Sequence, residues 1–205
     1  MSDYKIETKC IQSGYTPKNG EPRILPIYQS TTFKYDNSDE MGKLFDLEAS
    51  GYFYTRLQNP TNDAVAAKIC DMEGGVAAML TSSGQAANFY AIMNIAEAGD
   101  HIICSAAVYG GTYNLLEHTL PAYGVTTTFV DPADLSNFEK AIQENTKAVY
   151  IETLGNPNSN IIDIEAVAEI AHRHKIPLII DNTFGTPYLI RPIEHGADIV
   201  VHSAT

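Results

Sequence analysis

The sequence predicts an α/β fold in which a mostly parallel sheet is covered by helices on both faces. From Asn59 onward, short apolar runs alternate with amphipathic stretches of helical period. Most of these runs are continuously apolar and do not alternate between apolar and polar residues, as in strands that are buried on both faces. A chain of 205 residues buries about 70% of its unfolded surface, so such a core needs no disulfides.

The regular part begins with a helix over residues 60–73, because Asn59 can cap its start, Pro60 suits the first helical position and Gly74 can end it. The remaining elements are expected in chain order: a strand over 76–80, a helix beginning near residue 85, a strand over 101–104, a helix over about 112–120, a strand over 125–130, a helix over 134–143, a strand over 148–152, a helix over 164–174, and strands over 177–181 and 198–202. Helices between successive strands provide the crossovers that a parallel sheet requires.

Residues 1–60 are predicted to form an irregular N-terminal arm. Pro17, Pro22 and Pro26 interrupt any helix, and no long period of either kind is present. The arm is nevertheless dense in aromatic residues, which a free linker would lack. We therefore expect the arm to pack on its own body or on a neighbouring subunit, and we place a domain boundary between residues 60 and 61, with a ligand-binding domain over 61–205.

Composition excludes several classes of protein. Thirteen Lys and Arg against 25 Asp and Glu give a formal net charge of −12, which disfavours nucleic acid as a partner. Cys10, Cys70 and Cys104 are scattered without metal-ligand spacing and are typical of the reduced thiols of a cytoplasmic protein. No apolar run long enough for a membrane span and no apolar signal core occur. We expect a cytoplasmic protein without a metal site or a membrane partner.

Candidate site residues follow the predicted strands, where ligands bind to open parallel sheets. The Ser83-Gly84-Gln85 turn opens a helix directly after a strand, so free backbone N–H groups could hold an anion. Neither G-x-G-x-x-G nor G-x-x-x-x-G-K-[ST] occurs. An ordinary Ser N-cap is the alternative. Ser203 and Thr205, two apart in an extended segment, would direct their hydroxyls to the same side.

Two further residues suggest a flat, cationic ligand. Asp181 ends a buried strand, where a carboxylate is costly unless it meets a cation such as a protonated ring nitrogen; a loop-capping role is the alternative. Tyr109 precedes Gly110 and Gly111 and could stack on a ring, although a lone Tyr can also serve packing. With the anion cradle, these residues describe a site for pyridoxal 5′-phosphate. A lysine for its Schiff base is missing after the strands.

Six segments in order show that the chain resembles the cystathionine γ-synthase-like group of pyridoxal-phosphate enzymes of Cys and Met metabolism. They are Tyr54-Thr55-Arg56 with Asn59-Pro60-Thr61, Ser83-Gly84-Gln85-Ala86-Ala87, Tyr109-Gly110-Gly111-Thr112, Glu152-Thr153-Leu154-Gly155-Asn156-Pro157, Asp181-Asn182-Thr183, and Ser203-Ala204-Thr205. The resemblance implies the large domain of a fold type I enzyme. It also implies that the Schiff-base lysine follows Thr205 immediately, outside the chain, and that the chain is the N-terminal half of the enzyme.

The resemblance assigns roles to these residues. Tyr54 and Arg56 would reach the phosphate of a neighbouring subunit, and Asp181 would keep the pyridine nitrogen protonated. Tyr109 would stack on the ring and assist proton movement at the leaving group. The remaining cofactor-binding residues fall into two groups: a phosphate group of Ser83, Gly84, Gln85, Ser203 and Thr205, and a group near the cofactor hydroxyl, Thr183 and Asn156, of which Asn156 would also hold the substrate carboxylate.

Within the group, the stretch over residues 44–51 is similar to the O-acetylhomoserine sulfhydrylase branch, and Gly111 agrees because methionine γ-lyases commonly carry Cys there. The implied reaction converts O-acetylhomoserine and sulfide to homocysteine and acetate, in a homotetramer of dimers with shared active sites. Methionine γ-lyase and cystathionine γ-synthase or γ-lyase activities stay open as alternatives. A nicotinamide dehydrogenase is disfavoured by the missing glycine fingerprint. A non-catalytic interaction protein is likewise disfavoured for the intact gene product, although it describes this chain, which lacks the lysine for the Schiff base.

Overall fold

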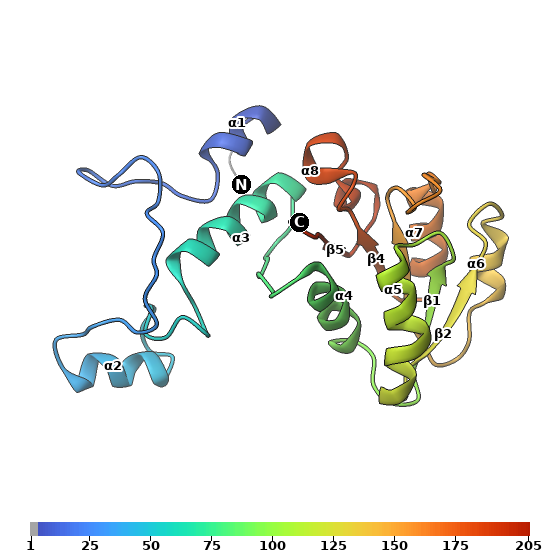
Figure 1. The fold of residues 1–205 in the computed structure, drawn as a ribbon, viewed down its shortest axis with the longest axis horizontal. Helices are drawn as coiled ribbons and strands as arrows, with labels where there is room; N and C mark the ends of the chain where they lie inside the picture. Colours follow the sequence, from blue (N-terminus) through green and yellow to red (C-terminus); the bar gives the residue numbers. More distant parts are fainter. Residues whose placement is uncertain (1–3) are drawn as a thin grey trace. The chain divides into compact units, whose positions relative to one another are not determined.

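The computed structural model describes residues 4–205 (Figure 1). The chain divides into two compact units, one ending at Leu80 and the other spanning Thr81–Thr205. The domain boundary between residues 60 and 61 that the sequence suggested stays a prediction, since compactness alone does not define a functional domain.

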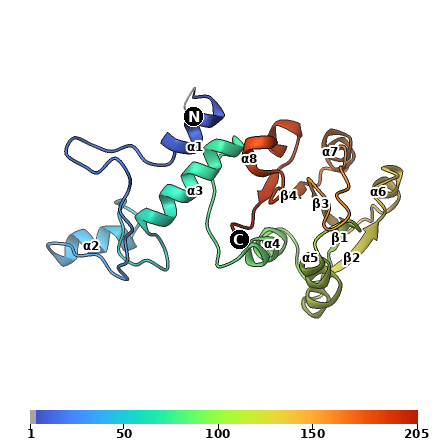
Figure 2. The same cartoon turned by 45° about the horizontal axis from the view of Figure 1, so that its top comes forward.

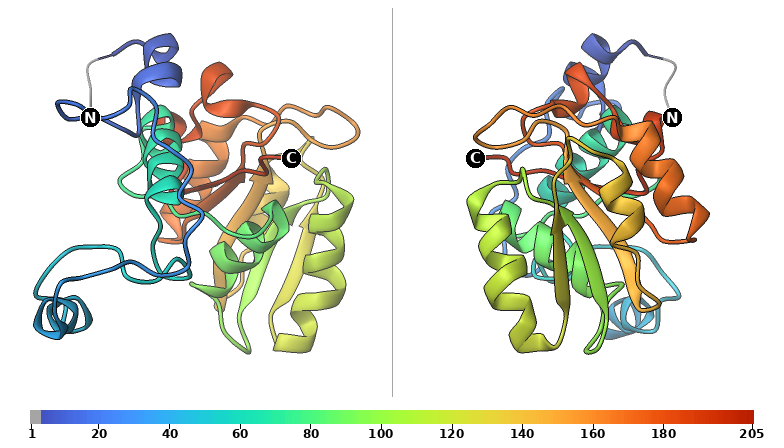
Figure 3. Two further views of the ribbon diagram at one scale, coloured as in Figure 1. Left: turned by 60° about the vertical axis from the view of Figure 1, so that its left-hand side comes forward. Right: turned by 90° about the vertical axis from the view of Figure 1, so that its right-hand side faces the viewer.

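The second unit contains one sheet of five parallel strands in the order β2-β1-β3-β4-β5 (Figure 3). The strands are β1 (His101–Ser105), β2 (Thr126–Val130), β3 (Thr146–Glu152), β4 (Leu178–Asp181) and β5 (Ile199–Val201). The predicted mostly parallel sheet is confirmed, and each of these strands lies within about two residues of its predicted bounds.

Helices cover both faces of this sheet, as predicted (Figure 2). On one face, α4 (Gly84–Met93) and α5 (Gly110–Asn114), which continues into a π-helical turn over Leu115–Thr119 and a 3-10 turn over Leu120–Tyr123, share a core with the strands. On the other face lie α6 (Ser136–Lys140) and α7 (Ile164–Arg173). A short helix, α8 (Thr186–Leu189), and a 3-10 turn over Pro192–His195 connect β4 to β5.

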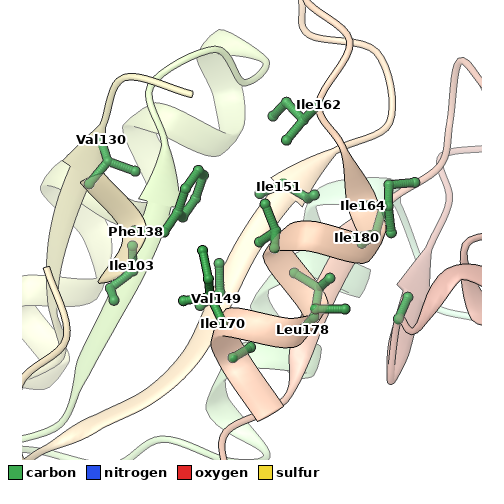
Figure 4. Packing of buried hydrophobic residues seen from close by; sticks show 14 residues of the cluster. Ile103, Val130, Phe138, Val149, Ile151, Ile162, Ile164, Ile170, Leu178 and Ile180 are labelled. Atoms are coloured by element: carbon green, nitrogen blue, oxygen red, sulfur yellow. The ribbon is translucent and has the colours of Figure 1, made fainter. Parts of the chain in front are cut away.

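The helix α7 illustrates why these residues fold as they do. Asp163 caps its start by accepting the Ala166 N–H at 3.1 Å. Its apolar face packs over the fully buried Leu178 and Ile180 of β4 (Figure 4). Each such side chain contributes about 2 kcal/mol of burial free energy, so helix and strand fix one another and hold the carboxyl end of β4 in place.

The strand register determines which polar residues meet at the carboxyl edge of the sheet. Glu152 of β3 pairs with Asp181 of β4, and Asp181 pairs with Val201 of β5. Paired residues of neighbouring parallel strands direct their side chains to the same face. Tyr150, two residues before Glu152, is packed in the core shared with α4 and α5, so this is the face onto which Glu152 and Asp181 point.

Over residues 4–80 the first unit contains three helices, α1 (Ile6–Gln12), α2 (Ser38–Phe45) and α3 (Pro60–Glu73). The helix α3 has its predicted bounds and its predicted Asn59 cap, which accepts the Thr61 N–H at 2.8 Å. The expectation of an arm without helices was wrong for α1 and α2. The helix α2 forms because Asn37 caps it by accepting the Glu40 N–H at 2.9 Å; two turns are too short to show a helical period.

The strand predicted over residues 76–80 was also wrong, because this segment has no strand structure. Its apolar side chains are exposed, and Val76 is fully accessible to solvent. An extended segment becomes a strand only when a neighbour pairs with its backbone, and the five strands described above pair only with one another. In residues 4–205, no helix is both long enough and apolar enough to cross a membrane.

Candidate functional site

The start of α4 is where the sequence predicts an anion cradle. Ser83 is extended and caps the helix, its hydroxyl accepting the Ala86 N–H at 3.1 Å. Within residues 4–205, no acceptor is seen for the N–H groups of Gly84 and Gln85, and these first-turn donors face outward with the positive end of the helix dipole. The cradle thus keeps two backbone donors for a ligand.

Gly84 brings this helix start against the segment that follows β5. A Cβ atom at Gly84 would lie 2.6 Å from the Cβ of Ser203, closer than side-chain carbons approach one another. Only glycine therefore permits the contact. The hydroxyl of Ser203 bonds the hydroxyl of Thr205 at 2.9 Å, so these two side chains do point to the same side. The structure thus gathers the five predicted phosphate residues at two adjoining segments.

Thr183 connects the cradle to Asp181. The Asp181 Oδ1 atom accepts the backbone N–H of Thr183 at 2.9 Å and its hydroxyl at 2.5 Å. The same hydroxyl oxygen accepts the Ser203 N–H at 2.8 Å. Thr183 therefore orients both Asp181 and Ser203, an arrangement that the strand-end pattern alone did not show. Its predicted contact with the cofactor stays a prediction.

These bonds leave one oxygen of Asp181 available. In the part of the chain that the structure describes, Oδ2 accepts no hydrogen bond and meets no cation. A partly buried carboxylate oxygen of this kind stabilises a positive charge placed beside it. It is thus suited to a protonated ring nitrogen.

Tyr109 lies at the start of α5, with its side chain half-exposed. A Cβ atom at Gly111 would lie 2.5 Å from Cε1 of the Tyr109 ring and 3.2 Å from Nε2 of Gln85. The phenol ring is therefore folded over the glycine and reaches the neighbourhood of the cradle. The Tyr109 backbone N–H donates to Oε1 of Glu152 at 2.8 Å.

Glu152 is a buried carboxyl to which the sequence assigned no role. Its side chain faces Asp181 from the neighbouring strand. The pKa of Glu152 is raised to about 7, chiefly by burial and also by the negative charge of Asp181, against the lowering effect of the Tyr109 N–H. One feature of the sequence could have identified Glu152: two neighbouring apolar strands each end in a carboxylate residue.

The sequence pattern also did not reveal a buried polar network beneath the site. The Tyr150 hydroxyl donates to Oδ1 of Asn88 at 2.8 Å, and the amide groups of Asn88 and Gln85 each contact Oγ1 of Thr112 at 3.3 Å. The network joins α4, α5 and β3. Burial raises the pKa of Tyr150 well above its usual value, and the Asp181 charge adds to this, so Tyr150 stays neutral.

The loop after β3 carries Asn156. Its approach to the loop after β1 depends on Gly155, where a Cβ atom would lie 2.8 Å from the carbonyl oxygen of Ala107. The Gly155 N–H is satisfied by the Asn160 carbonyl at 2.9 Å. Asn156 is half-buried beside these residues, and its contact with cofactor hydroxyl and substrate stays a prediction.

Tyr54 and Arg56 belong to the first unit. The Arg56 guanidinium carbon lies 5.0 Å from the centre of the Tyr54 ring, a cation–π contact that orients the guanidinium. The backbone between them is held because Thr55 N donates to the Thr31 carbonyl at 2.9 Å. The structure thus orders this pair, and its reach to a neighbouring subunit's phosphate stays a prediction.

The donors at the sheet edge fit pyridoxal 5′-phosphate. Backbone amides at a helix start and two hydroxyls from the Ser203–Thr205 segment match a phosphate, and the close approach that Gly84 permits lets them converge. The unpartnered oxygen of Asp181 matches a pyridinium nitrogen. The half-exposed ring of Tyr109 supplies an aromatic surface for the pyridine face.

Comparison with known proteins agrees with this chemistry. The model of a family described as Cys/Met metabolism PLP-dependent enzyme matches residues 7–205. The chain is 47% identical to an O-acetyl-L-homoserine sulfhydrylase of Leptospira meyeri, over 99% of this chain and 46% of the relative. It is 49% identical to an L-methionine gamma-lyase of Treponema denticola, over 97% of this chain and 50% of the relative. The chain therefore spans about half the length of these relatives.

A solved structure has the same fold. A protein from Campylobacter jejuni, described as an O-acetylhomoserine (thiol)-lyase with a pyridoxyl-lysine phosphate at position 205 of that chain, superposes with a TM-score of 0.93 at 40% identity. The superposition covers 98% of this chain and 50% of the other. The second unit (the sheet unit, Thr81–Thr205) thus has the fold type I architecture that the sequence predicted.

Proposed function

Because the chain belongs to the Cys/Met metabolism family of PLP-dependent enzymes, we propose that it forms the cofactor-binding part of an O-acetylhomoserine sulfhydrylase. The proposed reaction joins O-acetylhomoserine and sulfide and releases homocysteine and acetate. In this exchange the Cγ–O bond of the ester breaks and acetate leaves with the bonding electron pair, while a Cγ–S bond to hydrosulfide (HS⁻) forms and the sulfur keeps its proton as the thiol of homocysteine. No oxidant or reductant is needed.

The observation that carries the cofactor assignment is the open Oδ2 of Asp181 at the same sheet edge as the cradle at Gly84 and Gln85. When bound, pyridoxal 5′-phosphate supplies an electron sink for carbanions formed next to the substrate's amino group. Asp181 would hold a proton on the ring nitrogen through Oδ2. The Thr183 hydroxyl and N–H fix this carboxylate in place, so it cannot turn toward solvent.

The chain's other residues would bind and orient. The Gly84 and Gln85 amides, with the hydroxyls of Ser203 and Thr205, would hold the phosphate. Tyr109 would cover the ring face, exclude water from it and move a proton at the leaving-group oxygen. Arg56, oriented by Tyr54, would add a bidentate donor to the phosphate of a neighbouring subunit. Asn156 would orient the substrate carboxylate.

The choice of substrate rests on the relatives. Support for the sulfhydrylase comes from relatives of that name at 47% and 48% identity. A methionine γ-lyase is the second candidate, favoured by the 49% identity to the Treponema denticola protein. Identity thus does not separate the two reactions. The glycine at position 111 favours the sulfhydrylase, because the Tyr109 ring occupies the space that a larger side chain would take.

We further propose a homotetramer built from dimers with shared sites, located in the cytoplasm. Support for shared sites comes from Tyr54 and Arg56, which are ordered at the surface of the first unit. Support for a reducing compartment comes from Cys10, Cys70 and Cys104, all three of which are free thiols. Sedimentation of the intact gene product tests the assembly, and a monomer would contradict shared sites.

The direct test is a side-by-side assay of the intact gene product. It compares homocysteine formation from O-acetylhomoserine and sulfide with methanethiol formation from methionine. A faster first reaction supports the sulfhydrylase, and the reverse ranking would assign the lyase. Absorbance near 420 nm, expected for the bound cofactor, would be absent if the cofactor assignment is wrong.

A further inference from the structure

Glu152 is the one strand-end carboxyl of the sheet unit that the proposed mechanism does not use. Its side chain is 5% exposed, and a carboxyl group is seldom buried this deeply without a specific partner. Its hydrogen-bond partner is the Tyr109 backbone N–H, whose nitrogen lies 2.8 Å from Oε1. This bond crosses 43 residues of sequence and ties the end of β3 to the start of α5.

The bond lies where it can control the Tyr109 phenol. Tyr109 is the residue immediately before α5, and its own side chain makes no cap to the helix. Its backbone is extended (φ −52°, ψ 136°), so the chain turns sharply into the helix at this point. The bond to Glu152 holds the backbone N–H of Tyr109 and so fixes one side of that turn. The contact of the ring with Gly111 holds the other side.

We propose that Glu152 is a positioning residue, whose buried carboxylate fixes the Tyr109 backbone and thereby the phenol over the cofactor site. The inference rests on the proposed function for its catalytic consequence only. The contact itself needs no cofactor, because it joins two residues of this chain.

The charge of Asp181 couples this contact to the site. The ionisable groups that face Glu152 come from each neighbouring element: Asp181 of β4, Cys104 of β1, Tyr150 of β3 and Tyr109 before α5. On α4, Gln85 and Asn88, which join the polar network at Thr112 and Tyr150, do not ionise. Burial raises the pKa values of Cys104 and Tyr150, so both are neutral and Asp181 is the charge that Glu152 meets.

A cation beside Asp181 would therefore favour ionised Glu152. Asp181 disfavours the Glu152 carboxylate while its own charge is unmatched. Pairing Asp181 with a ring nitrogen removes that repulsion, and the ionised carboxylate accepts the Tyr109 N–H more strongly than the neutral acid does. Filling the site thus tightens the hold on Tyr109.

The first test is amide hydrogen exchange of Tyr109 in the cofactor-free intact gene product. Removing the acceptor in Glu152→Ala should lower the protection of this amide by about tenfold or more at pH 8.5, because the amide then loses a hydrogen bond to a charged group. In the wild type, protection should rise between about pH 6 and 8.5 as Glu152 ionises. Glu152→Gln keeps an acceptor without a titrating proton, so its protection should not change over this range.

Two controls keep the result interpretable. Glu144→Gln alters an exposed residue just before the other end of β3 and should behave as the wild type. Exchange of the β1 and β3 core amides reports whether each variant is folded. If Glu152→Ala does not fold, the Glu152→Gln profile decides alone. The proposal would be overturned if protection of the Tyr109 amide in Glu152→Gln rose with pH as in the wild type. It would also be overturned by unchanged protection in a folded Glu152→Ala.

The second test is kinetic. Glu152→Ala should lower kcat of the sulfhydrylase reaction by about tenfold or more with KM changed little, since the phenol acts at the reacting atoms. Glu152→Gln should recover most of kcat. If no sulfhydrylase activity exists, the exchange test still decides the role of Glu152. Full activity in Glu152→Ala would refute the catalytic consequence even where the exchange result holds.

Discussion

Replacing Gly111 by Ala probes how closely Tyr109 is positioned. The added Cβ would lie 2.5 Å from Cε1 of the Tyr109 ring, whereas carbon atoms rest at about 3.5 Å or more. The ring must therefore move by about 1 Å. Because the ring is 50% exposed, it can swing toward solvent without displacing the core.

We accordingly expect catalysis to suffer and folding to be spared. A displacement of about 1 Å in a catalytic group can cost about a hundredfold in rate, which is about 2.7 kcal/mol in the activation barrier. Stability should stay equal or rise by up to about 1 kcal/mol, because alanine favours helix over glycine. The assay is kcat for homocysteine formation by the intact gene product, with the melting temperature measured on the same sample.

Gly110→Ala is the matched control. The neighbouring glycine begins the same helix, but a Cβ there meets nothing within 4 Å. This variant should keep kcat within about threefold of the wild type, since a 1 Å displacement is not required. Gly111→Ala with unchanged kcat would refute the reasoning. Equal losses in both variants would show that the helix backbone, and not the ring contact, is responsible.

Four further variants test the remaining contacts. Asp181→Ala should abolish turnover yet leave some cofactor bound, measured by activity and by absorbance; unchanged turnover would remove the pyridinium pairing. Arg56→Ala should weaken retention of the cofactor on dialysis, and retention equal to the wild type would place the phosphate's arginine elsewhere. Glu152→Gln should be more stable than the cofactor-free wild type above pH 7, by up to about 3 kcal/mol for a pKa moved from 4.5 to about 7. The raised pKa means that the wild type loses stability as the pH rises from 4.5 to about 7. Urea unfolding should therefore show no difference in stability between Glu152→Gln and the wild type near pH 4.5. An equal difference near pH 4.5 and above pH 7 would contradict the raised pKa of Glu152. Tyr150→Phe leaves the buried Asn88 Oδ1 without its donor and should cost about 1–3 kcal/mol; a neutral result by urea unfolding would show that the network is not needed for stability.

The sequence by itself determined the sheet unit almost completely. Apolar runs and helical periods mark β1 and α7 because burial on the faces of a sheet selects those residue types locally. Candidate site residues at the sheet edge could be found as well, because parallel strands place their carboxyl ends at one edge, where Asp181 ends β4 and Ser203 follows β5. Ser83 lies at the start of α4, although the strand predicted before it does not form. Polar residues immediately after apolar runs are a local signal.

The tertiary structure decided what depends on contacts between distant segments. The run from Val76 to Leu80 is apolar enough for a strand, but strand formation needs a partner that residues 4–205 do not provide. The bond from Tyr109 to Glu152 and the Thr183 bridge between Asp181 and Ser203 join residues 20 to 43 positions apart. The type of a residue and its neighbours in the sequence indicate how deeply that residue is buried. Which distant residue it contacts depends on the register of the strands and on how the helices pack against them.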